Sequence, residues 1–330
     1  MSVMKKGIIL GLLVLVTGAV NAQQVPQYSQ YLRNQYLVNP GAAGVYDFTD
    51  VTIGGRMQWL GFDDAPKTSY LYMSTVLSKG SKVRYNPALR VSNGPIRNPK
   101  VKTGKLKHAI GGQVIADQYG AFRQLKFAGT YALHLPVSKN YNLSLGTSVG
   151  ISNRTFLADK AEVLSSILGT GIDPAYQTYT ADATGQNTVD IDAGLYFYSD
   201  ELFIGVSAAQ LTKDFIRFGN KITNFEPGIH LQFTAGYKFG ISDNLTLMPA
   251  VLVKQVTPAP ISIEGSLQIE YKEWLWAAAT YRHEDAVSIM VGLNISRKFK
   301  FGYAYDFNIS RLNNYSSGGH EIVLGLMLGR

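Results

Sequence analysis

The chain has 330 residues and a formal net charge of +8, and it contains no cysteine, which excludes disulfides, thiolate metal sites and a lipidated cysteine anchor. Only 16% of its residues are charged, its mean hydropathy is zero, and it is rich in glycine and tyrosine (33 Gly and 20 Tyr). No segment beyond the first residues is apolar enough for a membrane-spanning helix. This composition is typical of a membrane barrel, in which lipid-facing apolar residues alternate with polar lumen residues.

Residues 1–22 are expected to form a secretory signal peptide. Lys5 and Lys6 precede an apolar run over 8–16, and Val20-Asn21-Ala22 fits a small-residue cleavage site. The apolar run is too short to cross a bilayer as a helix.

Residues 23–50 form an N-terminal segment ahead of the first expected strand. Asn39-Pro40 followed by Gly41 favours a tight turn in it. Three roles are open for this segment: it folds back as a plug inside the barrel, it lies along the periplasmic rim, or it only orients the chain into the barrel.

Residues 51–330 are expected to form the barrel, because their apolar and polar residues alternate with period two. Ile263, Leu267 and Ile269, for example, interleave with Glu264 and Gln268. We expect an all-β transmembrane outer-membrane β-barrel of about 14 antiparallel strands, an even number as bacterial barrels require. The expected strands lie near Val51–Leu60, Ser69–Leu77, Leu106–Ala116, Arg123–Leu135, Tyr141–Asn153, Thr188–Tyr198, Glu201–Ala209, Ile229–Phe239, Asn244–Lys254, Ile261–Tyr271, Trp274–Tyr281, Ala286–Ile295, Lys298–Phe307 and His320–Gly329.

The lengths of the connections predict an orientation. Outer-membrane barrels have short periplasmic turns and longer external loops. With both termini periplasmic, short turns such as Ser199-Asp200 and Lys272-Glu273 fall inside. The long connections fall outside, at 154–187, 211–228 and 308–319.

One long connection, residues 78–105, breaks this rule and is strongly basic. No acidic residue occurs between Asp64 and Asp117. The basic residues offered as a partner-binding surface are Lys79, Lys82, Arg84, Arg90, Arg97, Lys100, Lys102 and Lys105. The segment is either a solvated basic surface or a docking surface for an acidic periplasmic partner, or for lipopolysaccharide if it lies outside. It has few aromatic residues for base stacking, so no nucleic-acid partner is expected.

The external connection after the fifth expected strand contains a possible short helix at Ala158–Leu168. Its apolar residues lie on one side at helical spacing, and Gly169 could end it. It is either a cap over the lumen or a partner-binding helix.

The predicted lumen face carries charged and amide side chains on separate strands. The acidic and amide members are Asp190, Asp192, Glu264, Gln268 and Glu270, and the basic candidates to pair with them are Lys298, Lys300 and Arg282. Such a network either fills the lumen or lines a passage for small solutes.

Catalysis is not expected. The five histidines are scattered without metal-ligand spacing, and His320-Glu321 lacks the second histidine of the HExxH zinc motif. We therefore assign no catalytic residue, metal or cofactor. Glu321 is expected to face the lumen on the last strand, with His320 at the outer rim.

Several motifs resemble those of one family. They are Gln27-Tyr28-Ser29-Gln30-Tyr31, Asn39-Pro40-Gly41-Ala42-Ala43-Gly44, Arg56-Met57-Gln58-Trp59, Ala65-Pro66-Lys67-Thr68, Tyr303-Ala304-Tyr305-Asp306 and Ser317-Gly318-Gly319-His320-Glu321. In order and spacing they resemble the PorP/SprF family, outer-membrane proteins associated with the type IX secretion system of Bacteroidota. The motif residues singled out are Asn39, Pro40, Gly44, Trp59, Pro66, Asp306, Gly318, His320 and Glu321.

The resemblance implies an outer-membrane barrel that supports export or surface attachment of a cargo protein, such as a gliding-associated adhesin. It implies contacts with ring components of the secretion system, with the secreted cargo and with outer-membrane lipids, and no catalytic activity. The alternative function is a diffusion or uptake channel for small solutes.

Overall fold

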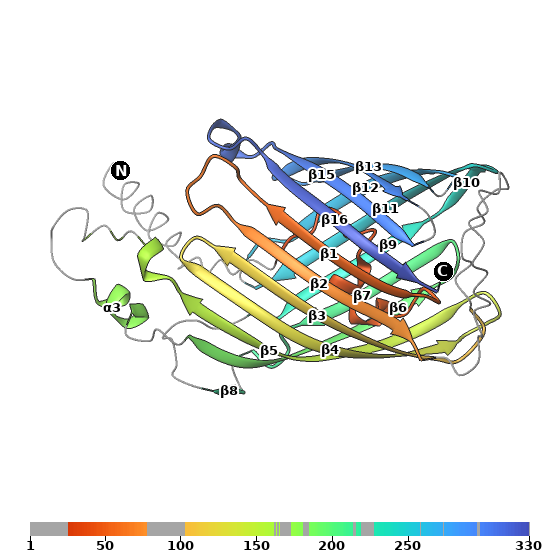
Figure 1. The fold of residues 1–330 in the computed structure, drawn as a ribbon, viewed down its shortest axis with the longest axis horizontal. Helices are drawn as coiled ribbons and strands as arrows, with labels where there is room; N and C mark the ends of the chain where they lie inside the picture. The colour runs from red at the N-terminus through yellow and green to blue at the C-terminus, as the bar shows by residue number, and fades with distance from the viewer. Residues whose placement is uncertain are drawn as a thin grey trace, which may run out of the picture.

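The structure is a computed structural model that describes residues 26–77, 103–161, 163, 165, 173–180, 185–213, 216–218, 228–257, 259–272, 274–295 and 298–329. Fourteen strands close into one antiparallel barrel, which confirms the expected fold class (Figure 1). In chain order the wall strands are β1 (Thr49–Met57), β2 (Lys67–Val76), β3 (Lys107–Tyr119), β4 (Phe122–Pro136), β5 (Asn142–Phe156), β6 (Gln186–Tyr198), β7 (Leu202–Ala209), β9 (His230–Tyr237), β11 (Leu245–Val256), β12 (Ser262–Tyr271), β13 (Leu275–Arg282), β14 (Ala286–Asn294), β15 (Phe299–Asn308) and β16 (Gly319–Leu328).

The barrel closes because β1 pairs with β16, with Thr49 opposite Leu328. Two short strands complete the sheet: β8 (Arg217–Phe218) pairs with β6, and β10 (Phe239–Ser242) continues β9 along β11. The break between β9 and β10 lies beside Pro249 of β11, which has no N–H to donate to a ladder.

Along each wall strand, side chains point alternately to the outer face and to the lumen, as the period-two pattern predicts. Ile263 is 46% exposed on the outer face, whereas its neighbour Glu264 is fully buried in the lumen. Exposed aromatic side chains ring both ends of the outer wall, as in other outer-membrane barrels. They are Tyr141, Tyr237, Phe239, Tyr271 and Trp274 toward one end and Phe122, Tyr281 and Phe307 toward the other.

The expected end of the first strand at Leu60 is wrong. β1 ends at Met57, because Trp59 adopts a left-handed backbone conformation with φ 51° and the chain turns there. Leu60 instead hydrogen-bonds the β15–β16 connection, donating to the Gly318 carbonyl at 2.9 Å and accepting from the Ser317 N–H at 2.6 Å.

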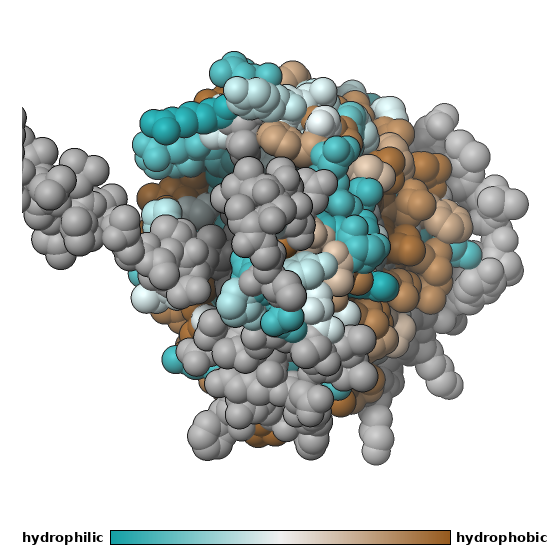
Figure 2. All heavy atoms as spheres, turned by 90° about the vertical axis from the view of Figure 1, so that its left-hand side faces the viewer, coloured by the Kyte–Doolittle hydropathy of each residue, from teal (hydrophilic) through white to brown (hydrophobic). Residues whose placement is uncertain are grey.

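The connections differ between the ends of the barrel. We call the end that carries the β1–β2, β5–β6, β7–β9 and β15–β16 connections the long-loop end; it lies at the left in Figure 1. Figure 2 looks onto this end and shows hydrophilic residues gathered over it, with hydrophobic residues on the outer wall at one flank. β1 begins and β16 finishes at the opposite end.

Within the expected helix at Ala158–Leu168, the structure describes a 3-10 turn, Ala158–Lys160, and only a few residues beyond Lys160. A short α-helix, α3 (Pro174–Thr180), occurs later in the same connection. In the described parts of the chain, no helix has the length and apolarity needed to cross a membrane.

Candidate functional site

The lumen is occupied by the chain's own N-terminal segment, residues 26–48, which we call the plug. It contains two single-turn 3-10 helices, η1 (Gln35–Leu37) and η2 (Pro40–Ala42). The plug enters near the long-loop end, where the Ser29 N–H donates to Glu321, and leaves at the opposite end, where Asp47 meets Lys107. Most of its side chains are buried, and they pack with inward-facing wall residues into one hydrophobic core.

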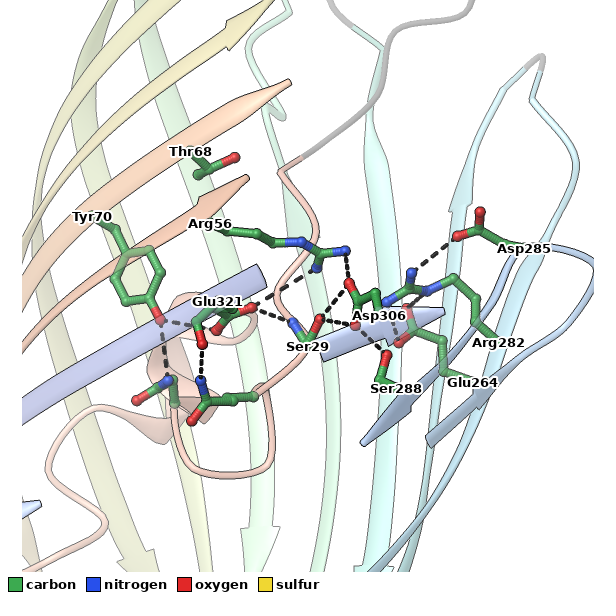
Figure 3. A network of polar contacts seen from close by, with 12 residues as sticks. Ser29, Arg56, Thr68, Tyr70, Glu264, Arg282, Asp285, Ser288, Asp306 and Glu321 are labelled. Carbon is green, nitrogen blue, oxygen red and sulfur yellow. Dashed lines mark hydrogen bonds and ion pairs between the residues drawn. The ribbon is translucent and has the colours of Figure 1, made fainter. Parts of the chain in front are cut away.

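A buried ionic network, the mouth network, holds the plug near the long-loop end (Figure 3). Arg56 on β1 lies 2.6 Å from Asp306 on β15 and 3.9 Å from Glu321 on β16. The Ser29 hydroxyl donates to Asp306 at 2.9 Å, and its N–H donates to Glu321 at 2.6 Å. Tyr70 on β2 donates to the other oxygen of Glu321. Ser29 of the plug therefore bridges two buried carboxylates that share the Arg56 guanidinium. Hydrogen bonds to ionised groups such as these are stronger than those between neutral groups.

A second group of charges continues the network across the wall (Figure 3). Glu264 on β12 lies 3.3 Å from Arg282 on β13 and 2.5 Å from Lys254 on β11. Arg282 also donates to Asp285 at 3.0 Å. The expected pairing of Glu264 with Arg282 is therefore present, and these charges line the lumen.

Neutral hydroxyl and amide groups fix the middle of the plug. Tyr31 lies 3.1 Å from the Ser266 hydroxyl, and Asn34 accepts from Tyr72 at 3.0 Å. The Tyr36 hydroxyl lies 2.6 Å from that of Thr130. Burial raises the pKa of the Tyr36 phenol to about 12, so this contact is a hydrogen bond between neutral groups at physiological pH.

The Asn39-Pro40 turn packs against the wall through glycines. The Asn39 side chain accepts from Gly41 N–H at 2.8 Å and donates to the Leu195 carbonyl at 3.0 Å, so it caps η2 and ties it to β6. A Cβ at Gly194 would overlap this carboxamide, and one at Gly146 would overlap the Pro40 backbone. The close approach therefore requires glycine on the wall.

At the opposite end, the plug is held by a backbone contact and an ion pair. The Ala43 carbonyl lies 2.9 Å from His134 Nε2 on β4, and His134 Nδ1 lies 2.8 Å from the Tyr198 hydroxyl. Asp47 pairs with Lys107 at 3.1 Å. A Cβ at Gly44, whose φ is 71°, would overlap Ala109, so this plug residue also depends on being glycine.

Three more cations in the lumen pair with carboxylates. Lys126 on β4 lies 2.6 Å from Asp192 and 3.8 Å from Asp190, both on β6. Lys300 pairs with Asp50 at 2.9 Å rather than with an acidic residue of the predicted set. The other predicted carboxylate, Glu270, lies 3.4 Å from plug residue Arg33.

The structure brings together only some of the residues singled out from sequence. Asp306 and Glu321 meet in the mouth network, and Gly318 lies in the adjoining loop, where it accepts from Leu60. Asn39 and Pro40 lie deeper, against β5–β7. His320 points out of the barrel and lies 2.6 Å from the Tyr303 hydroxyl.

Trp59 and Pro66 belong to the β1–β2 connection. The Pro66 carbonyl accepts a hydrogen bond from the Gln58 N–H at 2.9 Å. The rings of Trp59 and Tyr119 pack edge-on, with their centroids 6.0 Å apart. Of the predicted basic surface, only Lys105 is described; it is exposed at the opposite end. The other seven residues, Lys79, Lys82, Arg84, Arg90, Arg97, Lys100 and Lys102, lie outside the described residues.

Sequence reasoning missed the roles of Tyr36 and His134. Neither residue has neighbours in the sequence that indicate its role. Only the fold brings Thr130 to Tyr36 and the Ala43 carbonyl to His134. In the described ranges, no three histidine or acidic residues lie close enough together to hold a metal ion.

Comparisons with known proteins agree with this architecture. A family model described as type IX secretion system membrane protein PorP/SprF matches residues 20–326. No curated protein matches the chain. The toluene transporter TodX of Pseudomonas putida matches with a TM-score of 0.51 and 10% identity, over 90% of this chain and 94% of that one. A TodX deltaS2S3 mutant, described as a monoaromatic hydrocarbon channel, gives a TM-score of 0.50 and 9% identity over 90% and 94%. At these identities the likeness shows the barrel fold alone.

Proposed function

Because the chain belongs to the PorP/SprF family of type IX secretion system membrane proteins and is an outer-membrane β-barrel, we propose that it supports export or surface attachment of a partner cargo protein by binding. The cargo we infer is an adhesin or a gliding-associated protein. The observation that carries the proposal is the plug: the lumen is filled by residues 26–48, which hydrogen-bond to the wall along its length.

Cargo would therefore engage the ends of the barrel and not pass through it. Cavities lined by both plug and wall have volumes of about 190, 70 and 30 Å³, and a water molecule needs roughly 10–15 Å³ by the same measure. They have room for water molecules, and none is large enough for a polypeptide to pass through the lumen. A diffusion or uptake channel for small solutes, the alternative function, needs a continuous path through the lumen.

We further propose that the basic segment 78–105 is the docking surface for ring components of the secretion system. It joins β2 to β3 at the end opposite the long loops. A run of cations without acidic residues favours an acidic partner through long-range attraction. We assign this role to Lys79, Lys82, Arg84, Arg90, Arg97, Lys100, Lys102 and Lys105.

Affinity purification of the tagged protein from its native envelope tests both statements. We expect the wild-type barrel to recover a large surface protein or ring components. Replacing Lys100, Lys102 and Lys105 with glutamate should reduce the amount of ring components recovered without reducing barrel insertion. High salt should reduce their recovery with the wild-type barrel in the same way, because it screens the attraction between charges.

The matched control reverses three exposed basic residues toward the long-loop end, Lys67, Arg123 and Lys213. This variant should keep ring components at the wild-type level. Recovery of the wild-type barrel alone would contradict the binding function, and unchanged recovery with the Lys100, Lys102 and Lys105 variant would contradict the docking role.

A further inference from the structure

Tyr36 lines two of the cavities between the plug and the wall, one toward each end of the barrel. A third, of about 190 Å³, lies at the long-loop end between plug residue Gln27 and the strands β9 and β11. The larger of the two that Tyr36 lines, about 70 Å³, lies toward the long-loop end and is lined by Tyr28, Gln113, Lys126, Asp192 and Gln232 among others. The smaller, about 30 Å³, lies toward the opposite end and is lined by Arg33, Tyr46, Asp50 and Tyr72 among others. Tyr36 of η1 lines both.

This larger cavity combines apolar surface with several buried polar groups. The Oε1 atoms of Gln113 and Gln232 are buried there without a hydrogen-bond partner from the protein. Lys126 and Asp192 present a close ion pair to the same space. Buried acceptors of this kind are normally satisfied by ordered water, and a cavity of this size has room for on the order of five molecules.

Tyr36 is fixed between the cavities on three sides. Its hydroxyl lies 2.6 Å from Thr130 on β4, which in turn lies 2.5 Å from Ser148 on β5. Its ring meets Tyr72 on β2 edge-on at 5.5 Å. On the third side it approaches the bare backbone of Gly111 on β3, where a Cβ would lie 2.6 Å from the Tyr36 hydroxyl.

We propose that Tyr36 is the seal of a latent passage for small hydrated ions through the plugged barrel. The passage consists of the two cavities that Tyr36 lines, and the Tyr36 ring closes it between β2, β3 and β4. This inference does not rest on the secretion role, because a sealed wild-type barrel conducts nothing whether or not it binds cargo.

Planar-bilayer recordings in potassium chloride test the seal with the purified full-length protein. Wild type should be silent, and Tyr36→Ala should gain stable unitary current. Tyr36→Phe should remain silent, because the ring still fills the gap after losing its hydrogen bond. Insertion of every variant is checked by its heat-modifiable migration after reconstitution.

The matched control is Tyr31→Ala, which removes another buried tyrosine from the same plug, one that lines neither cavity. It should stay silent. Current from Tyr31→Ala equal to that from Tyr36→Ala would overturn the seal in favour of general loosening of the plug. Silence of inserted Tyr36→Ala, or equal current from Tyr36→Phe, would overturn it as well.

Because the chain contains no cysteine, Tyr36→Cys gives a second, reversible test that is independent of the alanine variant. Its thiol is the only one in the protein. Tyr36→Cys should conduct, an aromatic methanethiosulfonate reagent should abolish the current, and a reductant should restore it. A Tyr36→Cys barrel that inserts and is silent, or whose current the reagent leaves unchanged, would overturn the proposal.

Discussion

Arg56 is the cation that the mouth network shares. It contacts Asp306 and Glu321, and the three side chains are 2%, 6% and 1% exposed. Removing one partner from a buried ion cluster leaves uncompensated charge and costs about 3–5 kcal/mol. A pair open to solvent contributes only about 0–1 kcal/mol, because water and salt screen it.

We expect Arg56→Leu to lower the free energy of unfolding by about 3–5 kcal/mol, since two carboxylates then face each other across Ser29. Denaturant titration in detergent, followed by tryptophan fluorescence, measures the change. Lys160→Leu is the control: Lys160 pairs with Asp64 at 2.5 Å, but the two side chains are 31% and 33% exposed, so its loss should stay within about 1 kcal/mol. Equal losses of unfolding free energy in the two variants would contradict the larger contribution of the buried ion cluster.

At the scale of elements, the Asn39-Pro40 turn of the plug meets the wall at glycines, where the wall has no side chain. Asn39 lies over Gly194 on β6, and its amide nitrogen would lie 2.8 Å from a Cβ at Gly205 on β7. Glycines inside a strand are otherwise destabilising, because they add no side-chain packing and lose more backbone entropy on folding. Their presence here is explained by the space that the plug occupies.

Gly194→Ala should therefore lower the free energy of unfolding by about 1–3 kcal/mol, because the new methyl group overpacks the Asn39 site. Gly265→Ala is the matched control on β12: it is exposed on the outer wall, and a Cβ there would meet nothing within 4 Å. Its effect should stay within about 0.5 kcal/mol. The same denaturant titration measures both variants. An equal loss of unfolding free energy in the two would contradict overpacking at the Asn39 site.

The wall elements could be predicted from sequence because lipid and lumen impose alternation on every strand, as Ile263 and Glu264 illustrate. Local turn chemistry was harder, and the left-handed Trp59 ended β1 early. The plug contacts have no local signal at all. Ser29 and Glu321 lie 292 residues apart, so only closure of the barrel brings them together. Motif residues could be singled out, but not their partners.

At the scale of the whole molecule, the barrel is asymmetric from end to end. The long-loop end carries the mouth network and the joined β1–β2 and β15–β16 connections. The opposite end carries most of the short turns, the start of β1 and the connection that contains the basic segment. Barrels of this kind keep long loops outside and short turns in the periplasm, so the basic segment should face the periplasm.

Single cysteines in this cysteine-free chain test that orientation without background labelling. Tyr315 is 74% exposed in the β15–β16 connection, and Val137 is 60% exposed in the β4–β5 turn at the opposite end. A membrane-impermeant maleimide should label Tyr315→Cys on intact cells, because long loops face the medium. Val137→Cys should be labelled only after the outer membrane is permeabilised. The reverse pattern would put the basic segment on the cell surface, and docking of periplasmic ring components there would then be physically impossible.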